Sequence, residues 1–397
     1  MDNILIIIQK LKGGGAERAA ANLSKDLSQN YNVKIIVFDG SDVAYPYEGE
    51  LIDLKSPPRK TFIGKVILFV NRLIKIKRIK KKYNISCSIS FLEGANLLNV
   101  LTKKKEVIIT SQRNMMSKSI KSPLSKRILK YTADKSDFIV ALSKGVKLDL
   151  EEKFSVDSNK VMTIYNSCNK EWFMKSSLEV DNIISELDSN SKYIINVGRL
   201  HIQKGQWNLI KAFYLVQKKI PSAKLIILGT GELETSLKRL CANLNIADKV
   251  IFLGYLKNYH KLLEQCDVFV FSSLYEGLGN ALMEAMACNL PVISTDCSFG
   301  PREILSPDTD VFEKCYDIQM VKYGLLVPEI VSLDMDETDI VTKEHREMAK
   351  AIELVLTDEN IKNYYKNAST VRINDFSPEI IKQQWIELIE RLIRDSK

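Results

Sequence analysis

Residues 266–295 read CDVFVFSSLYEGLGNALMEAMACNLPVIST. The run 268–271 is continuously apolar, residues 281–287 have helical spacing, and 291–294 is apolar again. Short apolar strands that alternate with helices are typical of a parallel sheet with helices on both faces. This stretch therefore predicts a strand, a loop, a helix and a second strand parallel to the first.

The same alternation extends over most of the chain. In the first half, strands are predicted at 4–8, 33–38, 87–91, 107–110 and 138–142, and in the second half at 193–197, 224–228, 249–253, 268–271 and 291–294. Helical patterns between them include 17–27, 207–219, 233–244 and 281–287. We expect an α/β protein with two doubly wound, Rossmann-like parallel sheets that face a central cleft, with ligands beyond the carboxyl ends of the strands.

A break in the pattern indicates where the domains divide. A chain of 397 residues is too long for one comfortable core, and the stretch 166–191 is polar and lacks strong periodicity. The alternation restarts at 192–200, KYIINVGRL. We expect an N-terminal domain over 1–168 and a C-terminal domain over 191–377. The last helical segment, 378–397, is predicted to pack back on the first domain.

Charge is distributed unevenly between the two halves. Residues 1–168 hold 30 Lys and Arg against 16 Asp and Glu, whereas the rest holds 27 against 33. A basic half favours a polyanionic partner. The apolar runs are far shorter than the roughly 20 residues that span a bilayer, and no signal peptide is recognisable. Seven scattered cysteines without metal-ligand spacing are typical of a cytoplasmic chain with reduced thiols.

The basic character is concentrated in residues 59–82, which carry ten Lys or Arg. No acidic residue occurs between Asp53 and Glu93. A helical stripe is predicted at Phe62, Val66, Phe69, Leu73 and Ile76, and the cations singled out for binding are Arg72, Lys75 and Arg78. Such a helix suits an anionic membrane surface or the phosphates of a lipid-linked acceptor. The alternative is an ordinary domain helix with solvated cations. Nucleic acid is disfavoured because no aromatic residues are interleaved with the cations.

Two glycine-bearing loops have the composition of phosphate-binding turns. The first predicted strand runs into KLKGGGAER, where Gly14 and Gly15 precede a helix whose free N–H groups favour anions. In NVGRLHIQKG, residues 196–205, Arg199 and Lys204 follow another strand and suit a diphosphate. A plain turn and solvated surface charges are the respective alternatives. Gly229 and Gly231 end the next strand, where a turn and a ligand contact remain equally open.

Two carboxylates, Glu276 and Glu284, stand eight positions apart around the start of a predicted helix. Glu276 lies in the loop, and the backbone N–H groups over 277–280 (Gly277, Leu278, Gly279 and Asn280) are free to meet an anion or sugar oxygens. Glu284 lies about one turn into the helix and can lean toward its start. The pair could bracket a polyhydroxylated ligand. The alternative makes Glu276 a helix cap and Glu284 part of a buried structural ion pair.

These motifs together resemble family 4 retaining glycosyltransferases of GT-B architecture over nearly the whole chain. The most specific motifs are E-x7-E from Glu276 to Glu284, VGRL followed by QKG, and PVISTDCSFGPREIL at 291–305. GGGAER, ALSKGVK at 141–147 and IYNSCN at 164–169 agree. The resemblance extends to bacterial enzymes that assemble surface polysaccharides, such as lipopolysaccharide or capsule, and lipid-linked oligosaccharides.

The resemblance implies a role for each matching residue. Arg199 and Lys204 would hold the donor diphosphate, Glu284 the ribose, and Glu276 with the 277–280 backbone the transferred sugar. Gly14 and Gly15 would admit the donor from the other domain, and the base would rest near 229–232 and 254–256, which include Gly229, Gly231, Gly254 and Tyr255.

The resemblance also implies metal-independent chemistry, in which two cations neutralise the leaving diphosphate. The acidic stretches 308–310 and 334–339 are accordingly read as solvated loop. Many relatives carry a histidine in the first domain, whereas His201, His260 and His345 all lie in the second half here. In TSQRNMMS, residues 110–117, Arg113 could meet an acceptor phosphate or be an ordinary surface residue.

The expected function is transfer of a hexosyl or N-acetylhexosaminyl group from a nucleotide diphosphate sugar, with a UDP-sugar as the expected donor. The expected acceptor is a glycan on a polyprenyl diphosphate or other lipid, reached at the inner face of the membrane. Two alternatives are a sugar-nucleotide epimerase of similar fold and a non-catalytic nucleotide-sugar binding protein.

Overall fold

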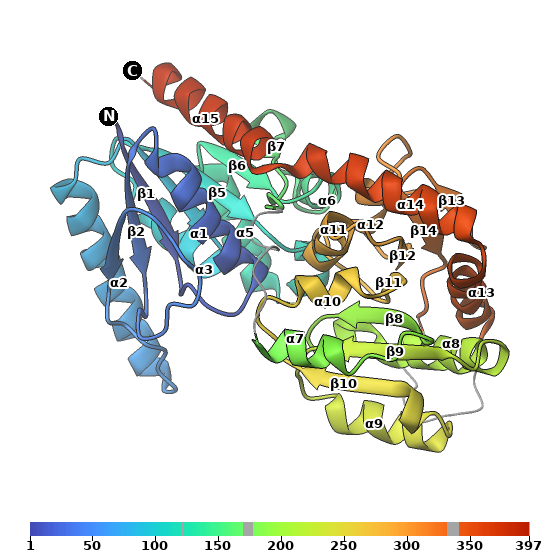
Figure 1. The fold of residues 1–397 in the computed structure, drawn as a ribbon. Coiled ribbons are helices and arrows are strands. Elements are labelled where there is room, and N and C mark those ends of the chain that lie inside the picture. The colour runs from blue at the N-terminus through green and yellow to red at the C-terminus, as the bar shows by residue number, and fades with distance from the viewer. Residues whose placement is uncertain (121, 170–177, 332–340, 397) are drawn as a thin grey trace. The chain divides into compact units, whose positions relative to one another are not determined.

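A computed structural model of the chain describes residues 1–120, 122–169, 178–331 and 341–396. The chain forms two compact units (Figure 1). Unit 1 comprises Met1–Ser167 and Pro378–Lys397, and unit 2 comprises Cys168–Ser377. Each unit contains one seven-stranded sheet.

The sheet of unit 1 has the strand order β3-β2-β1-β4-β5-β6-β7, and all its neighbouring strands pair in parallel. Its strands are β1 (Asn3–Ile8), β2 (Asn32–Val37), β3 (Glu50–Asp53), β4 (Cys87–Phe91), β5 (Val107–Gln112), β6 (Phe138–Ala141) and β7 (Val161–Thr163). The five strands predicted in this half are confirmed. The two edge strands, β3 and β7, were not predicted.

Helices cover both faces of this sheet. They are α1 (Gly15–Ser28), α2 (Phe62–Lys82), α3 (Glu93–Leu101), α4 (Met116–Ser119), α5 (Pro123–Lys135), α6 (Lys144–Phe154) and α15 (Pro378–Asp395). The C-terminal helix α15, red in Figure 1, packs in the same core cluster as strands β1 and β2. Its Ile381, Trp385 and Ile389 are buried there.

The sheet of unit 2 has the order β10-β9-β8-β11-β12-β14-β13. Its strands are β8 (Lys192–Val197), β9 (Ala223–Leu228), β10 (Val250–Gly254), β11 (Val268–Phe271), β12 (Val292–Thr295), β13 (Gln319–Val321) and β14 (Gly324–Val327). All pairs are parallel except the edge pair of β13 and β14, which is antiparallel. The predicted α/β class and parallel pairing are confirmed, with this edge hairpin as the difference.

Unit 2 carries helices on both faces as well. They are α7 (Leu178–Ser185), α8 (Gln206–Lys219), α9 (Glu234–Asn243), α10 (His260–Glu264), α11 (Asn280–Ala287), α12 (Pro301–Leu305), α13 (Lys343–Thr357) and α14 (Glu359–Arg372). Helix α7 lies in the stretch that the sequence pattern left without periodicity. In the core of unit 2, Trp207 and Phe213 of α8 are buried against the sheet.

Helix α2 presents its apolar residues differently from the predicted single stripe. Ile76 is buried and Phe69 and Leu73 are partly buried against the sheet, but Phe62 is 81% and Val66 48% exposed. At ~1.5 Å per residue the helix is about 30 Å long, whereas a six-residue strand spans about 20 Å. The N-terminal turns of α2 therefore extend past the sheet that buries its C-terminal turns, which the periodicity alone cannot show.

Candidate active site

The loop after β8 is held in place by a close approach to the loop after β9. Gly198 N donates to Leu228 O at 2.9 Å, and Leu200 N donates to Thr230 O at 3.0 Å. A Cβ at Gly229 would lie 2.0 Å from Gly198 O, and one at Gly231 would lie 2.2 Å from Leu200 O. These two glycines therefore serve backbone packing, and this packing fixes the loop that carries Arg199 and Lys204.

Lys204 and Glu276 meet at the carboxyl ends of two neighbouring strands, β8 and β11. Lys204 Nζ lies 2.5 Å from Glu276 Oε1, and Ser273 Oγ donates to the same oxygen at 2.7 Å. The Glu276 side chain is 9% exposed and that of Lys204 is 22% exposed. Ser272 Oγ also donates to the Lys204 carbonyl at 2.8 Å. The carboxylate is thus oriented by two donors while the ammonium group keeps access to solvent.

Arg199 joins a different carboxylate. Its Nη2 lies 3.2 Å from Glu232 Oε2, and His201 Nε2 lies 3.5 Å from the other Glu232 oxygen. A hydrogen bond from the Glu232 backbone N–H lowers the pKa of the Glu232 carboxyl. Arg199 and His201 lower it further by smaller amounts. The Arg199 side chain is 70% exposed. The two predicted diphosphate cations therefore share one loop but have separate carboxylate partners, and the pairing of Arg199 was not predicted.

Glu284 is buried on α11 and contacts α10 and the loop before it. The Tyr259 hydroxyl donates a hydrogen bond to Glu284 Oε2, and His260 Nε2 lies 3.9 Å from the same oxygen. The rings of Tyr259 and His260 stack at 4.7 Å. These partners were not predicted, because they lie about 25 positions upstream of Glu284 in a short loop and helix.

Helix α11 begins without a side-chain cap. Its N-cap is Gly279, whose φ of 104° lies in the left-handed region that disfavours other residues. Glu276 pairs with Lys204 instead, so the alternative that made Glu276 the helix cap is wrong. Leu278 is buried, whereas Gly277 and Asn280 are partly exposed.

The segment after β10 provides an exposed aromatic ring. Gly229 N donates to Gly254 O at 2.7 Å, which ties the ends of β9 and β10 together. Tyr255 follows directly and is 75% exposed. The structure therefore places the predicted base-contacting segments 229–232 and 254–256 at adjacent strand ends of unit 2.

In unit 1, Gly14 is the N-cap of α1 and Gly15 is its first residue. The Glu17 carboxylate lies over this turn, because a Cβ at Gly14 would be 2.4 Å from Glu17 Oε2. Burial raises the pKa of Glu17, although a backbone hydrogen bond and Lys10 oppose the effect. An acidic group therefore stands beside the glycine turn.

The predicted phosphate-binding cations of unit 1 differ in their surroundings. Arg72 donates to the Ser56 carbonyl and stacks over the Phe38 ring at 4.3 Å. Lys75 Nζ donates to Leu54 O at 2.6 Å, whereas Arg78 is exposed. Arg72 and Lys75 thus already bond to the backbone of unit 1.

Arg113 is not the surface residue that the sequence allowed. It is 6% exposed, donates to Asn166 Oδ1, and lies 3.3 Å from Ser111 Oγ. Burial lowers the pKa of Arg113 to about 9. A contact to an acceptor phosphate stays a proposal for this residue.

Within the described ranges, no cluster of three or more His, Cys, Asp or Glu side chains has the arrangement of a metal site. Asp308 pairs with Lys322 at 2.9 Å, and Asp310 Oδ1 accepts from Phe312 N. The acidic stretch 334–339 lies outside the described residues. Of the helices in these ranges, none has the length and apolar content to cross a bilayer.

Comparison with known proteins identifies both units. Residues 13–172 match the model of "Glycosyltransferase Family 4", and residues 179–326 match that of "Glycosyl transferases group 1". Among solved structures, Anabaena HepE in complex with UDP superposes with a TM-score of 0.76 at 19% identity, covering 98% of this chain and 100% of that one.

Sequence relatives extend over almost the full length. An uncharacterized glycosyltransferase of Methanocaldococcus jannaschii is 34% identical over 87% of this chain and 93% of its own. The N-acetylgalactosamine-N,N'-diacetylbacillosaminyl-diphospho-undecaprenol 4-alpha-N-acetylgalactosaminyltransferase of Campylobacter jejuni is 28% identical over 95% of this chain and 96% of its own. The chain therefore belongs to glycosyltransferase family 4 (glycosyl transferases group 1) and has the GT-B fold.

Proposed function

We propose that this glycosyltransferase moves a sugar from a UDP-sugar, with retention of configuration, to a glycan carried on a polyprenyl diphosphate. The Campylobacter relative is named for transfer to a diphospho-undecaprenol glycan, and the Anabaena neighbour binds UDP. Both suggest the classes of donor and acceptor. Hexosyl and N-acetylhexosaminyl donors both fit this proposal.

The observation that carries the proposal is the Lys204–Glu276 pair. An ammonium group has three N–H donors, and Lys204 uses one of them on Glu276. The remaining donors are available to the oxygens of a diphosphate, whose negative charge grows as the sugar departs. Glu276 can accept hydrogen bonds from sugar hydroxyls through its second oxygen. A cation for the leaving group and an acceptor for the sugar therefore lie side by side.

In the proposed reaction the acceptor hydroxyl oxygen forms a bond to the anomeric carbon on the face from which the diphosphate leaves. The bond between that carbon and the phosphate oxygen breaks, and its electron pair leaves with UDP. The acceptor proton passes to a donor phosphate oxygen. Lys204 and Arg199 neutralise the leaving group, so the step needs no metal ion in this proposal.

The other site residues bind and orient the donor. Glu284, held by Tyr259, accepts hydrogen bonds from the ribose hydroxyls, and Tyr255 offers its exposed ring to the base. A donor contact at Gly14 and Gly15 of unit 1 stays a prediction from the family resemblance, and the Glu17 carboxylate lies beside that turn.

We also propose that the protein binds the inner face of the membrane peripherally through α2. Besides Phe62 and Val66, the exposed apolar residues of this helix are Ile63, Ile67, Val70 and Ile74. No acidic residue lies between Asp53 and Glu93, so the flanking cations complement an anionic bilayer. Insertion of this apolar face would bring the enzyme to a lipid-linked acceptor.

The test is transfer of radiolabelled sugar from a panel of UDP-sugars to a lipid extract. Lys204→Ala and Glu276→Gln are each expected to lower transfer at least about 100-fold, because each removes a contact to the transition state. Lys219→Ala breaks a remote ion pair of unit 2, 2.8 Å to Glu353, and is expected to retain wild-type transfer.

Two outcomes would replace the proposal. Interconversion of the free nucleotide sugar without an acceptor would show that the protein is a sugar-nucleotide epimerase. Tight UDP-sugar binding with neither transfer nor hydrolysis for any donor and acceptor would establish a non-catalytic binding protein.

A further inference from the structure

Unit 1 contains a pocket of about 470 Å³ between helices α3 and α5, at the carboxyl ends of β4 and β5. Its lining comes from both helices and from the end of β5, and it includes Glu93, Asn96, Leu97, Gln112 and Ile128. Ligands of open parallel sheets bind beyond the carboxyl ends of the strands, and this volume is within the range of small-molecule sites. This α3–α5 pocket is thus suitably placed and sized for a ligand.

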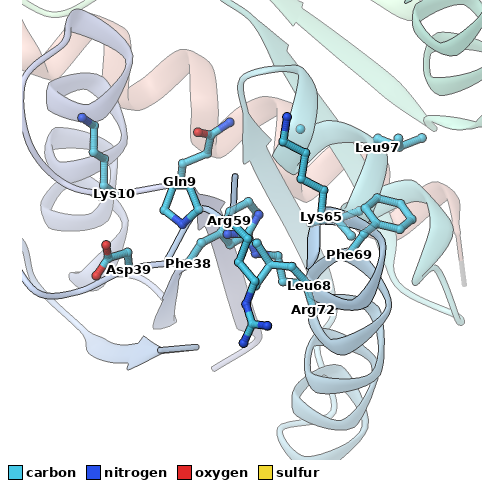
Figure 2. A pocket seen from close by; sticks show the side chains of 13 residues that line it. Gln9, Lys10, Phe38, Asp39, Arg59, Lys65, Leu68, Phe69, Arg72 and Leu97 are labelled. Atoms are coloured by element: carbon cyan, nitrogen blue, oxygen red, sulfur yellow. The ribbon is translucent and has the colours of Figure 1, made fainter. Parts of the chain in front are cut away.

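The charge of the lining distinguishes the α3–α5 pocket from its neighbour in the same unit. The neighbouring pocket, of about 520 Å³ at the carboxyl ends of β1 and β2, is lined by four cations: Lys10, Arg59, Lys65 and Arg72 (Figure 2). The two pockets share Gly94 and Leu97. Among the described residues that line the α3–α5 pocket, none is Lys or Arg, and Glu93 alone carries a charge. An anion would find no compensating charge there, so an uncharged ligand is favoured.

Two side-chain amides in the wall of the pocket are buried with unpaired oxygens. Asn96 and Gln112 are 0% and 2% exposed. Asn96 Nδ2 donates to the Ser111 carbonyl at 3.3 Å, but within the described ranges neither Asn96 Oδ1 nor Gln112 Oε1 accepts a hydrogen bond. Folded proteins leave few buried polar atoms unpaired, because each such atom costs free energy. The pocket therefore favours a ligand that brings N–H or O–H donors.

Gln112 is the amide best suited to contact a ligand. In the described part of the chain, neither the oxygen nor the nitrogen of its side chain forms a hydrogen bond. The terminal torsion of a glutamine side chain is broad and roughly two-fold, so a half turn exchanges the two atoms. Either atom can therefore face the cavity, and a second amide can pair with both through two hydrogen bonds.

Apolar side chains stand beside this amide. Leu97 of α3 is partly exposed, Ile128 of α5 is 37% exposed, and the buried Leu129 lies one position further along α5. A hexose with hydroxyl groups alone would leave the amide of Gln112 and these side chains without matching partners. An acetamido group offers one N–H, one carbonyl oxygen and a methyl group, which match both.

We propose that the α3–α5 pocket binds an N-acetylhexosamine residue of the acceptor glycan. The Gln112 amide exchanges two hydrogen bonds with the acetamido group, and the methyl group packs on Leu97 and Ile128. Asn96 and Glu93 accept hydrogen bonds from sugar hydroxyls. The proposal rests on the proposed function and adds to it the kind of sugar that the acceptor carries.

The test is titration of the full-length chain, followed by saturation-transfer NMR, with two pairs of methyl α-glycosides. N-acetylgalactosaminide is compared with galactoside, and N-acetylglucosaminide with glucoside, because the members of each pair differ only at C2. In at least one pair, the acetamido sugar is expected to bind about tenfold more tightly, since it adds two hydrogen bonds and a buried methyl group.

Gln112→Leu is expected to weaken binding of the acetamido sugar at least about tenfold. The same substitution removes an unpaired buried amide, so the urea midpoint of unfolding is expected to stay the same or rise. A purely structural role for Gln112 predicts the reverse, which is a lower midpoint with unchanged affinity for the sugar.

The matched control is Gln384→Leu on α15 of the same unit. Gln384 Oε1 is likewise buried without a hydrogen-bond partner among the described residues, and Gln384 does not line the α3–α5 pocket. The control is expected to change the urea midpoint in the same direction as Gln112→Leu and to bind the acetamido sugar like the wild type.

Three results would overturn the proposal: equal affinity within both pairs of glycosides, wild-type affinity in Gln112→Leu, or no saturation transfer from any of the four at about 10 mM. All three leave UDP-sugar-dependent transfer and its loss in Lys204→Ala intact. Failure of the proposed function would instead abolish transfer in the wild type, so the two failures are distinguishable.

Discussion

The two units have seven-stranded sheets, yet they hold their functional cations in opposite ways. In unit 2, Lys204 pairs with Glu276 and Arg199 with Glu232 at fixed positions. In unit 1, Lys10 and Lys65 stand in a pocket whose lining offers one carboxylate. A cation in an ion pair is held in one position, whereas Lys10 has only a longer-range attraction to Glu17 and Lys65 forms no ion pair within the described residues. This difference agrees with the proposed function, in which the paired cations of unit 2 meet the donor diphosphate.

The largest effect on stability is expected at Gly231, where close backbone packing holds the loop that carries Arg199 and Lys204. Gly231→Ala places a Cβ 2.2 Å from the Leu200 carbonyl and is expected to lower the free energy of unfolding by about 3 kcal/mol. Gly94→Ala, in the pocket of unit 1, meets only the Gln9 side-chain nitrogen at 3.2 Å. Its change should be within about 1 kcal/mol and can be stabilising, since alanine favours helix.

Urea denaturation of both variants measures the difference. If Gly94→Ala were as destabilising as Gly231→Ala, the contrast between a closely packed site in unit 2 and an open one in unit 1 would not hold.

The next effect concerns exposed apolar surface. Val66→Glu/Val70→Glu on α2 is expected to reduce sedimentation with phosphatidylglycerol vesicles about tenfold or more. The control Tyr364→Glu/Val371→Glu changes residues of unit 2 that are 57% and 60% exposed, and it should bind vesicles like the wild type. An equal decrease in both variants would show that α2 has no special part in membrane binding.

The pH is also expected to change the stability of the two units in opposite directions. Burial raises the pKa of Asp26 in α1 to about 6, although Lys382 opposes the effect. The folded state therefore holds this proton more tightly than the unfolded state, and the resulting stability is present below about pH 4 and lost as the pH rises through 6. In unit 2, burial lowers the pKa of His345 to about 4. The stability that neutral His345 contributes to the folded state is present above about pH 6.5 and is lost as the pH falls through 4.

Hydrogen exchange of α1 and of α13 between pH 4 and pH 7, corrected for intrinsic rates, measures the two contributions separately. Asp26→Asn is expected to stabilise unit 1 at pH 7 by about 1 kcal/mol, a value reduced for partial solvent screening. His345→Asn should remove the acid sensitivity of α13. The same pH response in both variants and wild type would contradict this assignment.

The smallest effect is expected on the KM for the donor, at the Tyr259–Glu284 contact that the sequence did not predict. Tyr259→Phe removes the hydroxyl that donates to Glu284 and should raise the KM for the donor about threefold to tenfold with little change in kcat. Steady-state kinetics with the preferred UDP-sugar measure this change. A fall in kcat at constant KM would mean that Glu284 acts on the transferred sugar instead of the ribose.

Sequence patterns predicted the inner strands of both sheets because buried parallel strands are continuous apolar runs. β4 and β11 have the predicted bounds. The strands that were not predicted lie at or next to a sheet edge and have only three or four residues. β3 and β13 are also not buried, so no apolar run marks them.

The site was partly predictable for the same reason. Lys204 and Glu276 each follow a predicted strand, and adjacent parallel strands bring their carboxyl ends together. Tyr259 could not be assigned to Glu284, because side-chain orientation in a short loop leaves no periodic signal. The exposure of Phe62 and Val66 depends on where α2 leaves the sheet, which is a property of the tertiary structure.

Calorimetric titration with UDP measures whether the Lys204–Glu276 pair of unit 2 receives the diphosphate of the donor, as proposed. UDP is expected to bind the wild type and Lys219→Ala alike, and Lys204→Ala is expected to weaken UDP binding at least about tenfold. Unchanged UDP affinity in Lys204→Ala would contradict the proposed role of the pair.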